Sequence, residues 1–241
     1  MHFIWNGIRE AWQLLLHPSA DLKSTIEVTL ELALGSTFFA LLFGVPVGLA
    51  LGTGRFRGRR TFLAVANGGL GLPPVLVGLI VFLLLARAGP LGGFNLVYTV
   101  RGMIVAQVIL NLPIVIVLVA AGAQAVRPEL IAQARAIGAS RRQVGTLVLR
   151  EARVSVLVAT IASIGAACSE VGAVIIVGGN IDLQTRTIAG AILTTVSEGR
   201  YDFAIALGIV LLGIVFLLAA ALTVVQLGGE HDNDPWRVRR R

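Results

Sequence analysis

The chain has 241 residues, of which 56% are hydrophobic and only 14% are charged, and its formal net charge is +7. Soluble domains carry roughly 25% charged residues, so this composition excludes an ordinary soluble enzyme or binding domain. The single cysteine, Cys168, excludes an internal disulfide, and we expect an inert thiol on the lipid-facing side of its helix.

The first residues are amphipathic and precede the apolar part of the chain. Ile8 and Trp12 share one helical face, and tryptophan suits the interface between membrane and water. These residues contain neither the basic segment nor the small-residue cleavage site that are typical of a signal peptide, so we do not predict one. We therefore expect residues 1–25 to contain an interfacial helix on the outer surface.

Five stretches reach the roughly 20 apolar residues that are needed to cross a bilayer. They are Leu32–Gly52, Phe62–Ala86, Met103–Ala125, Val154–Val177 and Phe203–Leu227. Only Glu170 places a charge inside any of them. The sequence therefore predicts an all-α integral membrane protein with about five transmembrane helices.

The basic residues predict the orientation of these helices. Arginines concentrate in residues 55–60, 127–153 and 237–241, and the positive-inside rule places these segments on the cytoplasmic side. The N-terminus is then outside and the C-terminus inside, with a transmembrane domain over 26–228 and a basic cytoplasmic tail over 229–241. Because the positive charge reflects this topology and the lipid headgroups, we predict the lipid bilayer as a partner and no nucleic acid.

The second predicted span contains an unusual group of helix-breaking residues, Asn67 to Pro74. A kink that allows close helix packing and a break that lines a transport pathway are equally open interpretations. In the third span, Gln107 and Asn111 lie one turn apart and share a face. Hydrogen bonds between helices are the slightly favoured interpretation, and a pore lining is the alternative.

The loop between the third and fourth spans, residues 127–151, carries signals for two short helices. Pro128 suits a first helical position, Gly138 offers a helix end, and Ser140 with Gln143 has the spacing of a capping box. We expect Leu130, Ala134 and Ile137 to form one apolar face of the first helix, with the arginines outward.

The fourth span has a stripe of small residues that includes Ala159, Ser163 and Ala167, and Glu170 follows in the adjacent row. Small residues allow close packing, so we expect Glu170 to face protein or a cavity and to act as a gate or structural element. Beyond it, a polar stretch offers donors for an anion. We assign the substrate pathway or gate to Gln107, Asn111, Glu170, Gly178, Gly179, Asn180, Thr185, Arg186 and Thr187.

Residues 132–140, AQARAIGAS, resemble the coupling-helix signature of ABC importer permeases, the membrane subunits of ATP-driven importers. Ala132 stands where the family usually has glutamate, and Arg150-Glu151 stand where many members have Leu-Pro. The resemblance implies that this helix docks on a cytoplasmic ATPase. It assigns that coupling to Leu130, Ala132, Gln133, Ala134, Arg135, Ile137, Gly138, Ala139 and Ser140.

Four further segments, 72–78, 88–92, 169–173 and 177–181, resemble oxyanion permeases of the tungstate and molybdate group, and most closely the tungstate type. The resemblance implies a type I ABC importer permease fold, a second copy of the chain, a cytoplasmic ABC ATPase dimer and an extracytoplasmic oxyanion-binding protein. It also implies tungstate, and second molybdate, as the cargo.

The only lysine, Lys23, follows Leu22, so the chain contains no Gly-Lys-Ser/Thr phosphate loop. We therefore expect a transport subunit rather than an enzyme, with no cofactor of its own and with ATP and Mg²⁺ on the partner ATPase. The alternative is a secondary transporter driven by an ion gradient, with Glu170 as its proton site.

Overall fold

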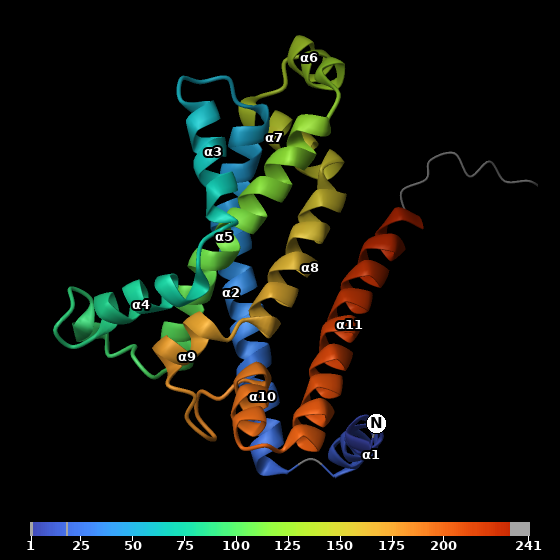
Figure 1. The fold of residues 1–241 in the computed structure, drawn as a ribbon. Helices are drawn as coiled ribbons and strands as arrows, with labels where there is room; N and C mark the ends of the chain where they lie inside the picture. The colour runs from blue at the N-terminus through green and yellow to red at the C-terminus, as the bar shows by residue number, and fades with distance from the viewer. Residues whose placement is uncertain (1, 18, 232–241) are drawn as a thin grey trace, which may run out of the picture.

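The computed structural model describes residues 2–17 and 19–231, and this part of the chain folds into eleven α-helices and one short 3-10 helix. Figure 1 shows that the long helices run roughly parallel and form a bundle, with the shorter helices around it. Their bounds are α1 (His2–Leu16), α2 (Ala20–Thr53), α3 (Arg59–Gly69), α4 (Pro74–Leu85), η1 (Gly92–Phe94), α5 (Val100–Ala125), α6 (Pro128–Ala136), α7 (Arg141–Glu151), α8 (Arg153–Ser169), α9 (Gly172–Gly178), α10 (Ile188–Ser197) and α11 (Tyr201–His231).

The bundle has two distinct ends. Helices α6 and α7 lie at one end, which we call the hairpin end, whereas α1 and α10 lie at the opposite end, which we call the far end (Figure 1). Helices α2, α5 and α11 are each long and apolar enough to cross a membrane. Two bent pairs, α3–α4 at 100° and α7–α8 at 66°, bring the candidate spans to as many as five. The predicted all-α membrane fold is confirmed.

The closest helix pairing in the bundle joins α2 to α5. Gly44 and Gly48 of α2 lie one turn apart, and each backs directly onto a valine of α5, Val115 and Val119 respectively. Val115 and Val119 are fully buried. Glycines at a four-residue interval let two helices approach without intervening side chains. Helix α2 continues through Pro46, which lies between these two glycines.

The second predicted span is broken, as the residues 67–74 suggested. Helix α3 ends at Gly69 and α4 begins at Pro74, and the axis turns by 100° between them. Pro73 and Pro74 lack the backbone N–H that would continue the helical ladder. The two halves therefore run in different directions, and α4 extends sideways from the bundle (Figure 1).

The prediction of one continuous helix over Val154–Val177 was wrong. Helix α8 ends at Ser169, and a separate short helix, α9, begins at Gly172. The Glu170 carboxylate accepts a hydrogen bond from the backbone N–H of Ala173 (3.3 Å). It satisfies a free donor at the start of α9, as side chains at helix N-termini commonly do. Glu170 therefore lies at a break between helices.

The predicted lipid-facing position of Cys168 was also wrong. The residue is only 1% exposed, and it packs with Ala33 of α2 and Ile164 of α8. Leu211 and Val215 of α11 cover this cluster. The side of α8 that carries Ile164 and Cys168 is therefore an inner face, because α11 packs over it.

The two ends of the chain only partly follow the predicted boundaries. Helix α1 packs on α11, where Gly7 backs onto Ile205, while Trp5 and Trp12 remain 60% and 65% exposed. Helix α2 begins at Ala20, so the boundary predicted at residue 25 falls inside a continuous helix. The predicted tail over 229–241 begins within α11, and residues 232–241 lie outside the described part.

Candidate functional site

The hairpin of α6 and α7 forms from local signals in the sequence. Gly138 adopts a left-handed conformation (φ +88°), which glycine tolerates without steric cost. Ser140 then starts α7 with a complete capping box: its Oγ accepts from the Gln143 N–H (3.4 Å), and its own N–H donates to Gln143 Oε1 (2.7 Å). The predicted break and restart are confirmed.

The apolar face predicted for α6 divides into two parts. Leu130 and Ala134 pack inward on a cluster that contains Val144 and Val148 of α7. Ile137 instead points away, and its side chain is 88% exposed. The prediction that Ile137 shares one face with Leu130 and Ala134 was wrong, because α6 ends at Ala136 and the chain turns there.

The hairpin therefore presents an outward surface at the end of the bundle. Among the large apolar side chains of the described residues, that of Ile137 is the most exposed. The exposed residues of this surface are Ala132, Gln133, Arg135, Ala136, Ile137, Gly138 and Ser140, while Ala139 is half-buried.

A buried polar cluster joins three helices in the middle of the bundle. Gln107 Nε2 donates to Asn111 Oδ1 (3.2 Å), and Asn111 Nδ2 donates to Ser36 Oγ (3.4 Å) and to the Ser163 carbonyl oxygen (3.3 Å). Gln107 and Asn111 are 1% and 0% exposed. In this conformation the two amides hold α2, α5 and α8 together, which agrees with the favoured interpretation of hydrogen bonding between helices.

The polar stretch after α9 forms a tightly bonded loop. Thr185 Oγ1 donates to the Gly178 carbonyl oxygen (2.6 Å) and accepts from the Ile181 N–H (3.0 Å). Thr187 Oγ1 caps α10 by accepting from the Gly190 N–H (3.1 Å). Both threonines are buried, so their hydroxyls hold the loop in its shape.

Asn180 and Arg186 of this stretch also form side-chain contacts. Asn180 has a left-handed backbone (φ +52°) and donates from Nδ2 to Thr194 Oγ1 (3.0 Å). Arg186 forms an ion pair with Asp182. The structure thus brings Gly178 to Thr187 together at the far end, and it places Glu170 at the other end of α9. Gln107 and Asn111 lie apart from them, in the polar cluster described above.

A second loop, residues 86–99, lies directly against this stretch and did not appear among the predicted site residues. The N–H of Tyr98 donates to the Val177 carbonyl oxygen (2.9 Å). A Cβ added to Gly179 would lie 2.7 Å from Cδ1 of Tyr98, so the ring rests on that glycine. Tyr98 itself has φ +60°, which is exceptional for a bulky residue and gives no signal in the sequence.

Comparisons with known proteins agree with this arrangement. A family model described as "binding-protein-dependent transport system inner membrane component" matches residues 44–226. A probable anion ABC transporter permease protein of Haloferax volcanii is 39% identical over 222 residues, which cover 90% of this chain and 93% of that protein. The tungstate uptake system permease protein TupB of Peptoclostridium acidaminophilum is 35% identical over 226 residues, which cover 94% of this chain and 99% of that protein.

Solved structures share the fold at lower sequence identity. The MetNI methionine ABC transporter in an inward-facing conformation matches with a TM-score of 0.70 and 19% identity, over 85% of this chain and 94% of that chain. A bacterial alginate ABC transporter, in complex with its substrate-bound periplasmic protein, also reaches 0.70, over 87% of this chain and 79% of that one. The predicted type I ABC importer permease fold is confirmed, and the chain belongs to the family of inner-membrane components of binding-protein-dependent transport systems.

Proposed function

We propose that this chain is the membrane permease subunit of an ATP-driven tungstate importer, with molybdate as a second substrate. Two relatives that match over nine-tenths of the chain are tungstate uptake permeases, from Peptoclostridium acidaminophilum and Campylobacter jejuni. The molybdenum permease of Azotobacter vinelandii matches less closely, at 30% identity over 81% of the chain. The family match favours this function over a secondary transporter with Glu170 as its proton site.

The observation that carries the proposal is the outward surface of the α6–α7 hairpin. Helix α6 is anchored to α5 and α7 by its inward apolar residues, while Ile137 and the neighbouring polar residues remain exposed. Interfaces concentrate their binding energy in a few central residues, and Ile137 is the large apolar residue that a partner would bury here. The partner that fits this surface is a cytoplasmic ABC ATPase dimer, which supplies ATP and Mg²⁺.

The other partners follow from the same assignment. Two copies of this chain enclose the pathway, and the far end faces outward, where an oxyanion-binding protein delivers the cargo. The N-terminus is then outside and the C-terminus cytoplasmic. The polar stretch from Gly178 to Thr187 and Glu170 belong to this pathway, where Glu170 acts as a gate because a fixed negative charge repels an anion.

The first test concerns the ATPase. Replacing Ile137 by aspartate introduces a charge into the outward surface without filling any packed space, so the membrane fold is retained. We expect loss of ATPase co-purification. Phe94→Asp is the matched control, because Phe94 is an apolar residue, 69% exposed, in the 86–99 loop, away from the hairpin. Co-purification of the ATPase with Ile137→Asp at the wild-type ratio contradicts the proposed docking surface.

The second test concerns the cargo. The chain, its ATPase and its binding protein are reconstituted together in proteoliposomes, and uptake of tungstate, molybdate and sulfate is compared at equal concentrations. We expect ATP-dependent uptake that decreases from tungstate to molybdate to sulfate. Uptake that continues without ATP and follows a proton gradient supports the secondary transporter instead.

A further inference from the structure

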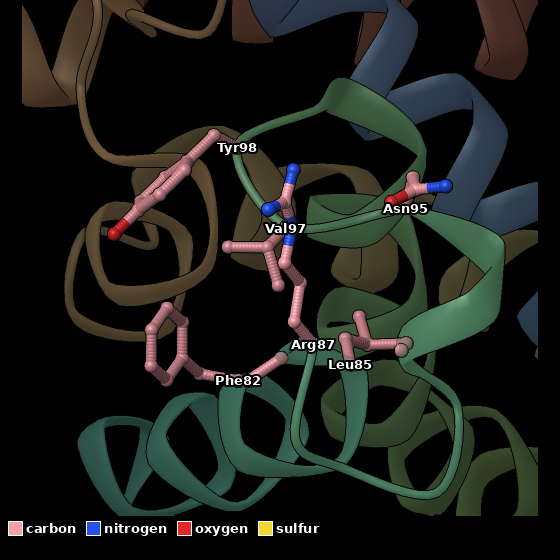
Figure 2. A pocket seen from close by; sticks show the side chains of 8 residues that line it. Phe82, Leu85, Arg87, Asn95, Val97 and Tyr98 are labelled. Carbon is pink, nitrogen blue, oxygen red and sulfur yellow. The ribbon is translucent and has the colours of Figure 1, made fainter.

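A cavity of about 440 Å³ lies between the end of α4 and the 86–99 loop, beside the candidate pathway. Figure 2 shows the Arg87 side chain extending across it, with the guanidinium reaching the segment from Asn95 to Tyr98. The lining residues are Phe82, Leu85, Ala86, Arg87, Gly92, Asn95, Val97 and Tyr98. The volume far exceeds the roughly 30 Å³ that one water occupies in the liquid, so a hydrated tetrahedral anion fits.

Arg87 gives this cavity a positive charge that no carboxylate of the lining neutralises. Arg87 is the only charged residue in the lining, and within residues 2–17 and 19–231 it makes no ion pair or side-chain hydrogen bond. Arginine presents a planar set of N–H donors that binds the oxygens of carboxylates and phosphates in pairs. The apolar walls formed by Phe82, Leu85 and Val97 lower the local dielectric constant and strengthen such a contact.

Three other arginines, Arg101, Arg186 and Arg200, are less suited to an anion. Arg186, the residue that the sequence suggested for the outer mouth, is neutralised by its ion pair with Asp182. Arg200 pairs with Glu198 (3.4 Å). Arg101 lines a different cavity, which also contains Glu31. Of these four arginines, Arg87 is therefore the one whose cavity lining contains no carboxylate.

The cavity also shares one side chain, that of Tyr98, with the candidate pathway. The rings of Phe82 and Tyr98 lie 6.2 Å apart and form one wall, and the same Tyr98 ring rests on Gly179. Every non-glycine residue with positive φ in the described chain falls in these two loops: Asn95, Tyr98, Asn180 and Leu183. Strained backbone of this kind is concentrated at functional sites because the surrounding structure must hold it in place.

We propose that the cavity around Arg87 is a binding site for the tetrahedral oxyanion at the outer mouth of the pathway. Arg87 supplies the charge, and Tyr98 connects occupancy of the cavity to the Gly178–Thr187 stretch. This inference rests on the proposed function for the identity of the anion. It adds a site in the permease itself, separate from the binding protein.

The test compares Arg87→Gln with Arg101→Gln in the permease–ATPase complex in lipid nanodiscs, without the binding protein. Saturation binding of radioactive tungstate is measured directly. Losing one charge-assisted contact should raise the half-saturating tungstate concentration about tenfold for Arg87→Gln, whereas Arg101→Gln should bind as the wild type does. Arg87→Lys keeps the charge but not the paired donors, so it should fall between the two.

Equal binding by Arg87→Gln and the wild type overturns the site, and so does an equal loss in Arg101→Gln, which indicates a general charge effect. The association of the binding protein with each variant is measured in parallel. If Arg87→Gln weakens only that association, Arg87 binds a carboxylate of the binding protein and the proposal is wrong. If the wild-type complex binds tungstate through Arg87 but imports none with its partners present, the proposed function fails and the site stands.

Discussion

The packing of α2 against α5 makes a sharp prediction about stability. A Cβ on Gly48 would lie 2.8 Å from Cβ of Val119 and 2.9 Å from the backbone oxygen of Ile116. Neither atom belongs to the free end of a flexible side chain, so Gly48→Ala forces the helices apart. Overpacking of this kind costs about 1–3 kcal/mol. The gain in helix propensity, about 1 kcal/mol, partly offsets it.

A matched variant removes that offset. Gly213 lies in α11 with nothing within 4 Å of an added Cβ, so Gly213→Ala gains the same helix propensity without a clash. The difference between the two variants therefore isolates the packing cost of about 1–3 kcal/mol. At about 2–4 °C per kcal/mol for a chain of this size, we expect Gly48→Ala to melt roughly 2–12 °C below Gly213→Ala.

The chain supplies its own reporter for this measurement. Cys168 is the single cysteine, and it is 1% exposed, so a dye that fluoresces on reaction with a thiol reports only unfolding. Thermal melts of the purified wild type and both variants are recorded in the same detergent. Coincident melting of Gly48→Ala and Gly213→Ala would refute the close contact between α2 and α5.

Three further predictions concern the gate, the buried polar cluster and the topology. Glu170→Gln keeps an acceptor for the α9 backbone, so we expect the thermal stability of the wild type. Because the variant changes the proposed gate, we expect a changed ATPase rate in the absence of substrate. If both that rate and anion uptake are unchanged, the assignment of Glu170 as a gate is wrong. Asn111→Leu leaves buried partners on α2 and α8 unsatisfied, which should cost about 1–3 kcal/mol and lower the melting temperature. In a Cys168→Ala background, a cysteine at Ala136 should react only from the cytoplasm and one at Gly93 only from outside; the reverse pattern overturns the orientation.

The parts of the fold that the sequence predicted well are those controlled by local chemistry. Pro128, Gly138 and Ser140 each act on the backbone within a few residues, and the hairpin forms where they place it. Membrane spans can also be predicted from the sequence, because a helix that crosses the lipid needs a long apolar run of residues. The break between Gly69 and Pro74 follows from residues that cannot continue a helix.

The errors arose where distant segments decide the outcome. Helix α11 is apolar on all sides, so no stripe in its sequence reveals that it covers Cys168. The break after Ser169 lies within an apolar run that contains no proline. The ion pair between Arg186 and Asp182 has the i, i+4 spacing of a helical pair and could have been found, but the loop that brings these residues together could not.

Helix α8 is the element that relates the two candidate sites to each other. It follows α7 at a bend of 66°, and its 17 residues extend about 26 Å at 1.5 Å per residue before they end beside Glu170. Thr37 Oγ1 bonds to Ser163 Oγ (3.3 Å) at its middle, and small residues line the same face. We expect this helix to carry a displacement of the hairpin to Glu170 and then to α9, whose end carries the contact between Gly179 and Tyr98.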